Sequence, residues 1–156
     1  MLTFEPVTEA GLDIVREIVH SNPDYNRMEN GSEARSDAAL REEFLHGDPA
    51  RRTLFIKADD TYIGLLEYME HNVRDNHPWL GLLMIHGDYQ GYGYGANAYF
   101  TWEEQLRGQG HTSVRLGVLP ANERARRFWE GLGFTFYEQK QTTAGAVADC
   151  FEKQLA

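Results

Sequence analysis

The stretch Gln90-Gly91-Tyr92-Gly93-Tyr94-Gly95 carries glycine at alternate positions. An almost wholly apolar run, 79–86, precedes it, and a helical pattern follows it. Glycine lets the main chain approach a ligand closely and adopt positive φ, and the unpaired N–H groups at a helix start favour an anion. The stretch therefore predicts a phosphate-binding loop between a strand and a helix, although a tight turn that merely leads into a helix has the same appearance.

The spacing of these glycines does not match two common nucleotide motifs. No Gly-Lys-Ser/Thr follows, as a Walker A loop requires, and the final x-x-Gly of the dinucleotide fingerprint is missing. Nucleotide hydrolysis and hydride transfer are therefore disfavoured.

The flanking sequence predicts a mixed α/β fold. The run 79–86 is typical of a strand buried on both faces. Downstream, apolar periodicity predicts a helix after Gly95, a strand over 112–118, a helix after Asn122, and strands over 134–138 and 146–153 joined by a turn at 142–145. Upstream, it predicts a helix over 9–20 capped by Thr8, a polar connection over 22–31, a short helix from Ser36, and a hairpin of strands 52–58 and 62–70.

Two motifs in the chain resemble motifs of the GCN5-related N-acetyltransferase (GNAT) family. Gln90-x-x-Gly93-x-Gly95 is similar to the family's Gln/Arg-x-x-Gly-x-Gly/Ala loop, which grips the coenzyme A pyrophosphate. Asn122-x-x-Ala125, followed by Phe128-Trp129 and Gly131-Leu132-Gly133-Phe134, is similar to the family's Asn-x-x-Ala…Tyr…Gly-Phe segment. The resemblance implies one GNAT domain over 1–156, with a mixed, mainly antiparallel central sheet, splayed central strands and flanking helices.

The resemblance also implies acetyl-CoA as cosubstrate. In the implied fold the strands 79–86 and 112–118 splay apart, and the pantetheine arm enters the gap and pairs with freed backbone groups. The residues that the resemblance assigns to the coenzyme are Leu83, Met84, Ile85, Gln90, Gly91, Tyr92, Gly93, Tyr94, Gly95, Ala96, Asn122, Phe128 and Trp129.

The implied activity is transfer of an acetyl group to a primary amine of a small molecule, polyamine or peptide, by direct attack in a ternary complex. The chain departs from the family at two catalytic positions. Trp129 stands where many members have a tyrosine that protonates the thiolate, and Gly117 stands where some have a glutamate base. A non-catalytic acyl-CoA-binding or regulatory module on the same fold is therefore the alternative.

Glu67 is the candidate general base, because in an extended strand it shares a face with apolar residues, and desolvation there would raise its pKa. Alternatively, that face borders solvent or Glu67 pairs with an arginine. Weaker candidates are His86, Glu70 and His71. Substitute hydroxyls could come from Tyr92, Tyr94, Tyr99 or Tyr137, which could equally be packing residues.

The early polar connection is expected to lie over the cleft that binds the acceptor. By resemblance Asn22, Asp24 and Tyr25 lie above the acceptor cleft, and Asp24 could anchor a cation, although Asn-Pro-Asp is also common in plain turns.

Composition limits the partners. With 156 residues and a net charge of −9, the chain would repel nucleic acid and attract a cationic amine.

The start of the chain has no secretory pattern and no run suits a membrane span, which predicts a cytoplasmic protein. Cys150 is the single cysteine, and no His/Cys/Asp group has metal-ligand spacing, so no metal is expected. A homodimer is compatible with the resemblance, since family members often pair.

Overall fold

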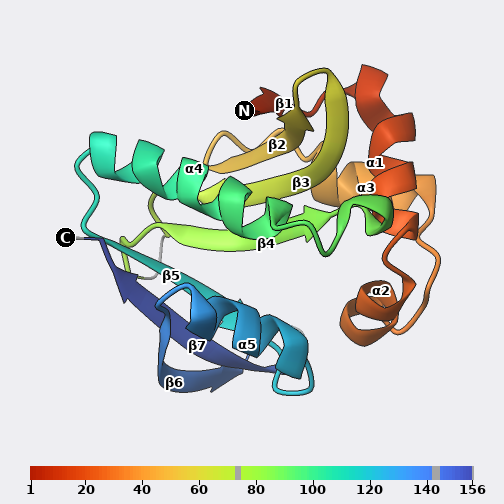
Figure 1. Cartoon of the computed structure of the whole chain (residues 1–156). Helices are drawn as coiled ribbons and strands as arrows, with labels where there is room; N and C mark the ends of the chain where they lie inside the picture. The colour runs from red at the N-terminus through yellow and green to blue at the C-terminus, as the bar shows by residue number, and fades with distance from the viewer. Residues whose placement is uncertain (73–74, 142–144, 156) are drawn as a thin grey trace.

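The computed structural model describes residues 1–72, 75–141 and 145–155. In these residues the strands form one seven-stranded sheet in the order β1-β2-β3-β4-β5-β7-β6 (Figure 1). Neighbouring strands are antiparallel except β4 and β5, which run parallel, so the mixed, mainly antiparallel sheet is confirmed. The strands are β1 Leu2–Pro6, β2 Arg51–Ala58, β3 Thr61–Met69, β4 Trp79–Ile85, β5 Ser113–Val118, β6 Thr135–Gln141 and β7 Val147–Gln154.

Helices cover both faces of the sheet. Two core clusters are separated by the alternation of side chains along β2 and β3: Ile56 and Leu66 pack with α4 and α5, whereas Phe55 and Leu65 pack with α1 and α3. The helices are α1 Leu12–His20, α2 Pro23–Asn30, α3 Asp37–Phe44, α4 Tyr94–Gly108 and α5 Glu123–Gly131, with short 3-10 turns η1 Glu9–Gly11 and η2 Gly87–Tyr89. None of the helices in the described part of the chain is both long and apolar enough to cross a bilayer.

The apolar stripe predicted for α4 is confirmed. Ala98, Trp102 and Leu106 recur one turn apart and are at most 1% exposed, because this face lies on the sheet. Burying it fixes the start of α4 next to the end of β4, where the glycine loop lies (Figure 1).

The central strands diverge, as expected. β4 and β5 pair only at Trp79↔Arg115 and Leu80↔Leu116 among the described residues. On its other edge β4 carries a bulge, because Glu67 pairs with Leu82 but Tyr68 pairs with Leu80. The extra residue, Gly81, is exposed. The prediction that this strand is buried on both faces is therefore wrong at Gly81, since the divergence uncovers the strand.

Two predictions for the N-terminal third are corrected. Thr8 makes no side-chain cap, and the α-helix begins at Leu12 after a 3-10 turn. The connection 22–31 contains α2, with Pro23 in its first turn and Gly31 at the left-handed position that ends it (φ 77°). Proline fits the first turn of a helix because the N–H it lacks has no intrahelical partner there. The predicted turn at 142–145 lies mostly outside the described residues.

The short helix predicted from Ser36 is confirmed, and the Ser36 side chain caps it. Removing this cap should therefore destabilise the protein. Ser36 Oγ accepts a hydrogen bond from Ala39 N (3.1 Å). Ser36→Ala should lower the free energy of unfolding by about 1 kcal/mol and Tm by roughly 2–4 °C, as measured by calorimetry. The exposed Ser32→Ala is the matched control, and equal Tm values for the two variants would contradict the capping role.

Candidate active site

The glycine loop presents main-chain donors toward open space. Gly91 and Gly93 have φ of 87° and 84°, and no heavy atom lies within 4 Å of a Cβ built at either position. Gly93 is the N-cap of α4, and Gly93 O accepts the first helical hydrogen bond, from Asn97 N (3.1 Å). The N–H groups of residues 94–96 therefore have no intrahelical partner and face the same space, an arrangement suited to an anion.

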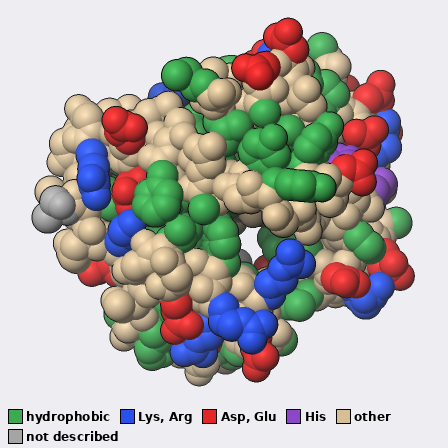
Figure 2. Space-filling model, in the orientation of Figure 1, with side chains coloured by type: hydrophobic (Ala, Val, Ile, Leu, Met, Phe, Trp, Pro, Cys, Tyr) green, Lys and Arg blue, Asp and Glu red, His purple; other side chains and the backbone are tan. Residues whose placement is uncertain are grey.

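A groove of about 810 Å³ opens beside this loop. Its walls are the diverging ends of β4 and β5, the loop before α4 with the start of that helix, and one side of α2 and of α5. Figure 2 shows the opening between these parts of the molecule, with Lys and Arg side chains gathered below it, over α5. The groove contains every residue assigned to the coenzyme from sequence except Tyr92, which is 75% exposed outside it.

Arg124 adds positive charge to the groove. It lies in the first turn of α5 and lines the groove wall, and it forms no ion pair with any described carboxylate. The cationic guanidinium and the start of α4 both favour an anion at this end of the groove. The sequence interpretation missed Arg124, although its position two residues after Asn122 was a usable signal.

Gln90 and Asn22 brace the groove. Gln90 Nε2 donates to Asn22 Oδ1 (2.7 Å) and to Ile85 O (2.8 Å), and Asn22 Nδ2 also donates to Ile85 O (3.1 Å). These bonds join the end of β4, the glycine loop and the start of α2. Both side chains line the groove, and these hydrogen bonds hold their amides in place.

A second, smaller pocket of about 170 Å³ adjoins the groove. Its ionisable groups are mainly acidic: Glu29, Glu43 and Glu67, with Arg35 as the only basic lining residue. Both cavities are lined by the same stretch of β4 and the same face of α2, through Tyr25, Glu29, Gly81, Leu82 and Met84. The bulge in β4 is therefore where the groove beside the glycine loop meets an acidic pocket.

The family model described as the acetyltransferase (GNAT) family matches residues 15–134. The chain belongs to the GNAT family of acetyltransferases. No protein in the search of curated proteins matches it significantly.

Solved structures share the fold along the whole chain. An acetyltransferase from Thermus thermophilus is 22% identical with a TM-score of 0.84, covering 99% of this chain and 97% of its own. A spermidine N-acetyltransferase from Vibrio cholerae, solved with CoA and spermine, is 18% identical with a TM-score of 0.74. The match covers 99% of this chain and 95% of that one. An aminoglycoside acetyltransferase solved with coenzyme A is 17% identical with a TM-score of 0.78. The match again covers 99% of this chain and 95% of the other.

GNAT enzymes use acetyl-CoA, so the position of each tyrosine and of Trp129 decides whether it can donate a hydrogen bond to the thioester. Trp129 is 8% exposed and packs edge-on against Tyr99 and Phe134, which makes it part of the core as well as of the groove wall. Tyr99 is buried and donates to Glu103 (2.9 Å), and this burial raises its pKa. Of the four tyrosines proposed from sequence, Tyr94 alone lines the groove.

Glu67 lies in the small pocket and is held by neighbours. Glu67 Oε1 accepts from Arg51 Nη2 (2.7 Å), and Oε2 accepts from Thr53 Oγ1 (2.9 Å). The sequence alternative in which Glu67 pairs with an arginine is therefore the observed one. Both carboxylate oxygens of Glu67 are therefore already engaged, one by a guanidinium and one by a hydroxyl.

The sequence interpretation did not identify Glu29. This residue is exposed but lines both cavities, and partial desolvation, followed by repulsion from Glu43, raises its pKa. It forms no ion pair with any described residue. Glu43 differs, because Arg35 pairs with it at 2.9 Å. Burial also raises the pKa of the neighbouring Tyr25, which keeps its hydroxyl a donor.

The remaining sequence candidates lie apart from this junction. Asp24 lines the mouth of the groove and pairs with Arg27 (3.1 Å). His86 is buried outside both cavities, where its Nδ1 accepts from Asp88 N (3.0 Å). Glu70 and His71 lie elsewhere on the sheet, in a cluster described below.

Proposed function

We propose that this GNAT acetyltransferase moves an acetyl group from acetyl-CoA to a primary amine of a cationic acceptor, by direct attack in a ternary complex. The observation that carries the proposal is the shared wall of the two cavities at the β4 bulge. A donor in the groove and an amine in the acidic pocket would meet at Gly81. Such positioning supplies much of the rate of an acyl transfer.

The coenzyme would lie along the groove. Its pyrophosphate would accept hydrogen bonds from the N–H groups of residues 94–96, with Arg124 adding charge. The pantetheine would run along β4, whose edge toward β5 has no ladder partner in the described residues beyond Leu80. Its amides could pair there with main-chain groups, as in an added strand.

The acceptor would enter the small pocket as a cation. Glu29, Glu43 and Glu67 outnumber Arg35 and Arg51, the two arginines paired with Glu43 and Glu67, so the pocket attracts an ammonium group electrostatically. The narrow pocket fits the end of a flexible chain better than a bulky ring system. Two of the similar structures are a spermidine acetyltransferase and an aminoglycoside acetyltransferase, both named for amine acceptors, which supports this acceptor class.

Glu29 is the proposed general base. An amine attacks only when neutral, so the ammonium must lose a proton near the thioester. Glu29 reaches both cavities, lacks a cationic partner among the described residues and has a raised pKa. Glu67 would instead anchor a distal positive charge. The Tyr25 hydroxyl, which lines both cavities, can donate a hydrogen bond to the thioester oxygen as it becomes charged.

Thiol release from acetyl-CoA with a panel of amines tests this proposal. The panel should hold diamines, polyamines, aminoglycosides, a peptide with a free N-terminus, and neutral hydroxyalkyl amides as blanks. Turnover should be highest with polycationic amines and fall with rising salt, since exposed charge attraction is screened. Coenzyme binding by calorimetry without thiol release from any amine would instead favour the non-catalytic acyl-CoA-binding module.

Glu67→Gln tests the anchor role. We expect KM for a polycationic acceptor to rise about 3- to 10-fold, a loss typical of one partly solvated charge contact, with KM for acetyl-CoA and the pH dependence of kcat unchanged. Steady-state kinetics across pH provide the measurement. In wild type, kcat should fall at low pH as the base becomes protonated. Loss of that fall in Glu67→Gln would make Glu67 the base and overturn its assignment as an anchor.

A further inference from the structure

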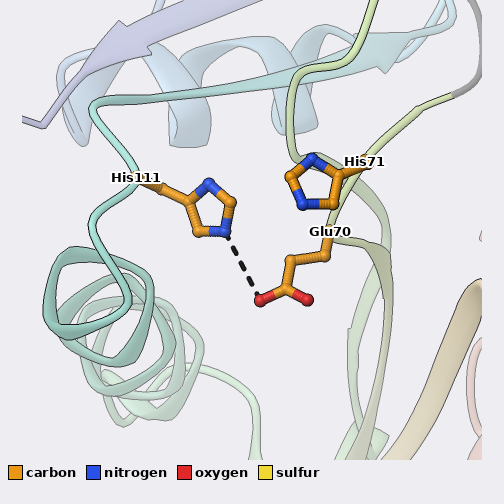
Figure 3. Close-up of side chains that lie close together, drawn as sticks. All are labelled: Glu70, His71 and His111. Carbon is orange, nitrogen blue, oxygen red and sulfur yellow. Dashed lines mark hydrogen bonds and ion pairs between the residues drawn. The ribbon is translucent and has the colours of Figure 1, made fainter.

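We propose that Glu70, His71 and His111 form a binding site for a divalent transition-metal ion of the zinc type. The three side chains converge from two separate connections of the fold (Figure 3). Glu70 and His71 directly follow β3, and His111 lies between α4 and β5. Imidazole nitrogen with a carboxylate oxygen is a ligand set that zinc, nickel, cobalt and copper accept.

The spacing of the ligand atoms fits a single ion. One ligand atom from each residue lies within 4.8 Å of the other two. Zinc holds nitrogen and oxygen ligands at about 2.0–2.2 Å in tetrahedral geometry, so two ligand atoms of one ion lie about 3.4 Å apart. Small side-chain rotations of Glu70 and His71, which lie at the surface, can close the remaining gap.

The contacts within the cluster leave coordination capacity unused. His111 Nε2 lies 3.4 Å from Glu70 Oε1, a long contact, and the His71 and His111 rings lie 5.4 Å apart. The His71 ring makes no hydrogen bond with the described residues. A plain Glu70–His111 ion pair therefore leaves the His71 nitrogens without a role, whereas one shared ion would use all three side chains. Three protein ligands would leave a further position for water.

The main chain at His111 is held in place by a hydrogen bond. His111 N donates to Leu106 O (3.0 Å) at the end of α4. Nearby, the β3–β4 connection contacts the start of β5, where His77 Nδ1 lies 2.9 Å from Ser113 Oγ. An ion would therefore add to existing contacts between the described residues on either side of the cluster.

The site would stabilise rather than catalyse. β4 and β5 run parallel, and the cluster lies at the end where both begin, whereas the groove opens where both end. The ion would link the ends of β3 and α4 across the start of the parallel pair. This role is independent of acetyl transfer, so the proposal does not depend on the acceptor or on the base.

Metal titration of the chelator-treated full chain tests the site. With ZnCl₂ in calorimetry we expect one ion per chain, and at 100-fold excess over Kd a Tm rise of at least about 5 °C. Co²⁺ should give visible d–d absorption with nitrogen and oxygen ligation. MgCl₂ should have no effect, because magnesium prefers an all-oxygen shell.

Variants assign the ligands. His111→Ala, His71→Ala and Glu70→Gln should each weaken Zn²⁺ binding at least about 10-fold, while His20→Ala, a histidine outside the cluster, should leave it unchanged. Circular dichroism of each metal-free variant checks that the fold is retained. Absence of stoichiometric binding, or equal binding by His71→Ala and wild type, would overturn the proposal.

Discussion

Replacing Gly95 with tryptophan is expected to weaken acetyl-CoA binding at least about 100-fold, a loss near 2.7 kcal/mol, without unfolding the protein. Gly95 lies in the first turn of α4, and a Cβ there would lie 3.4 Å from Phe128 Cζ and 3.8 Å from Ile85 Cγ1. A Cβ alone therefore fits between the two walls of the groove. An indole would fill the space beside the loop N–H groups that the pyrophosphate is proposed to occupy.

Binding calorimetry with acetyl-CoA provides the measurement, and α4 supplies its own control. Gly108 lies at the other end of the same helix, with no atom within 4 Å of a built Cβ, so Gly108→Trp should bind the coenzyme normally. Gly95→Ala should also bind and gain about 0.5–1 kcal/mol of stability, because glycine disfavours helix. Binding within a few-fold of wild type by Gly95→Trp would place the coenzyme elsewhere.

The elements built from local signals could be predicted from sequence. α4 follows from apolar residues one turn apart and from the glycines before it, and α5 follows Asn122, whose Oδ1 accepts from Ala125 N (3.0 Å). The divergence of β4 and β5 is different, since nothing in their periodicity encodes it. That prediction came from the family resemblance, and the pairing of only two residues in each strand confirms it.

The parts of the site that depend on distant pairs could not be predicted. Gln90 was assigned to the coenzyme because of its motif, but its amide reaches Asn22, 68 residues away. Glu67 was ranked by its apolar face, yet its ion-pair partner, Arg51, lies on the neighbouring strand. His71 and His111 lie far apart in sequence, and only the sheet brings them together.

The overlooked helix α2 had usable signals. Its hydrophobic residues are few, so a search for an apolar stripe finds nothing. Pro23 in the first turn and Gly31 just past the end are nevertheless the usual boundary residues of a helix. Recognising them would have placed Tyr25 and Glu29 one turn apart on one face, and both line the two cavities.

Replacing Glu29 with glutamine is expected to lower kcat about 100-fold, the lower end of what a lost general base removes. A base works deprotonated, so kcat should rise as pH passes upward through the pKa of Glu29. Desolvation and Glu43 raise that pKa, which places the acid limb of the profile above the usual range of a glutamate. Glutamine has nearly the same shape but accepts no proton, so this limb should disappear.

The control is Glu42→Gln on α3, which changes the same charge at an exposed position outside both cavities. It should leave kcat and its pH profile unchanged, which separates proton transfer from the general effect of removing one negative charge. KM for acetyl-CoA should also be unchanged in Glu29→Gln. A retained acid limb in this variant would exclude Glu29 as the base. Because Arg51 and Thr53 already occupy both carboxylate oxygens of Glu67, water would then be the remaining route for the proton.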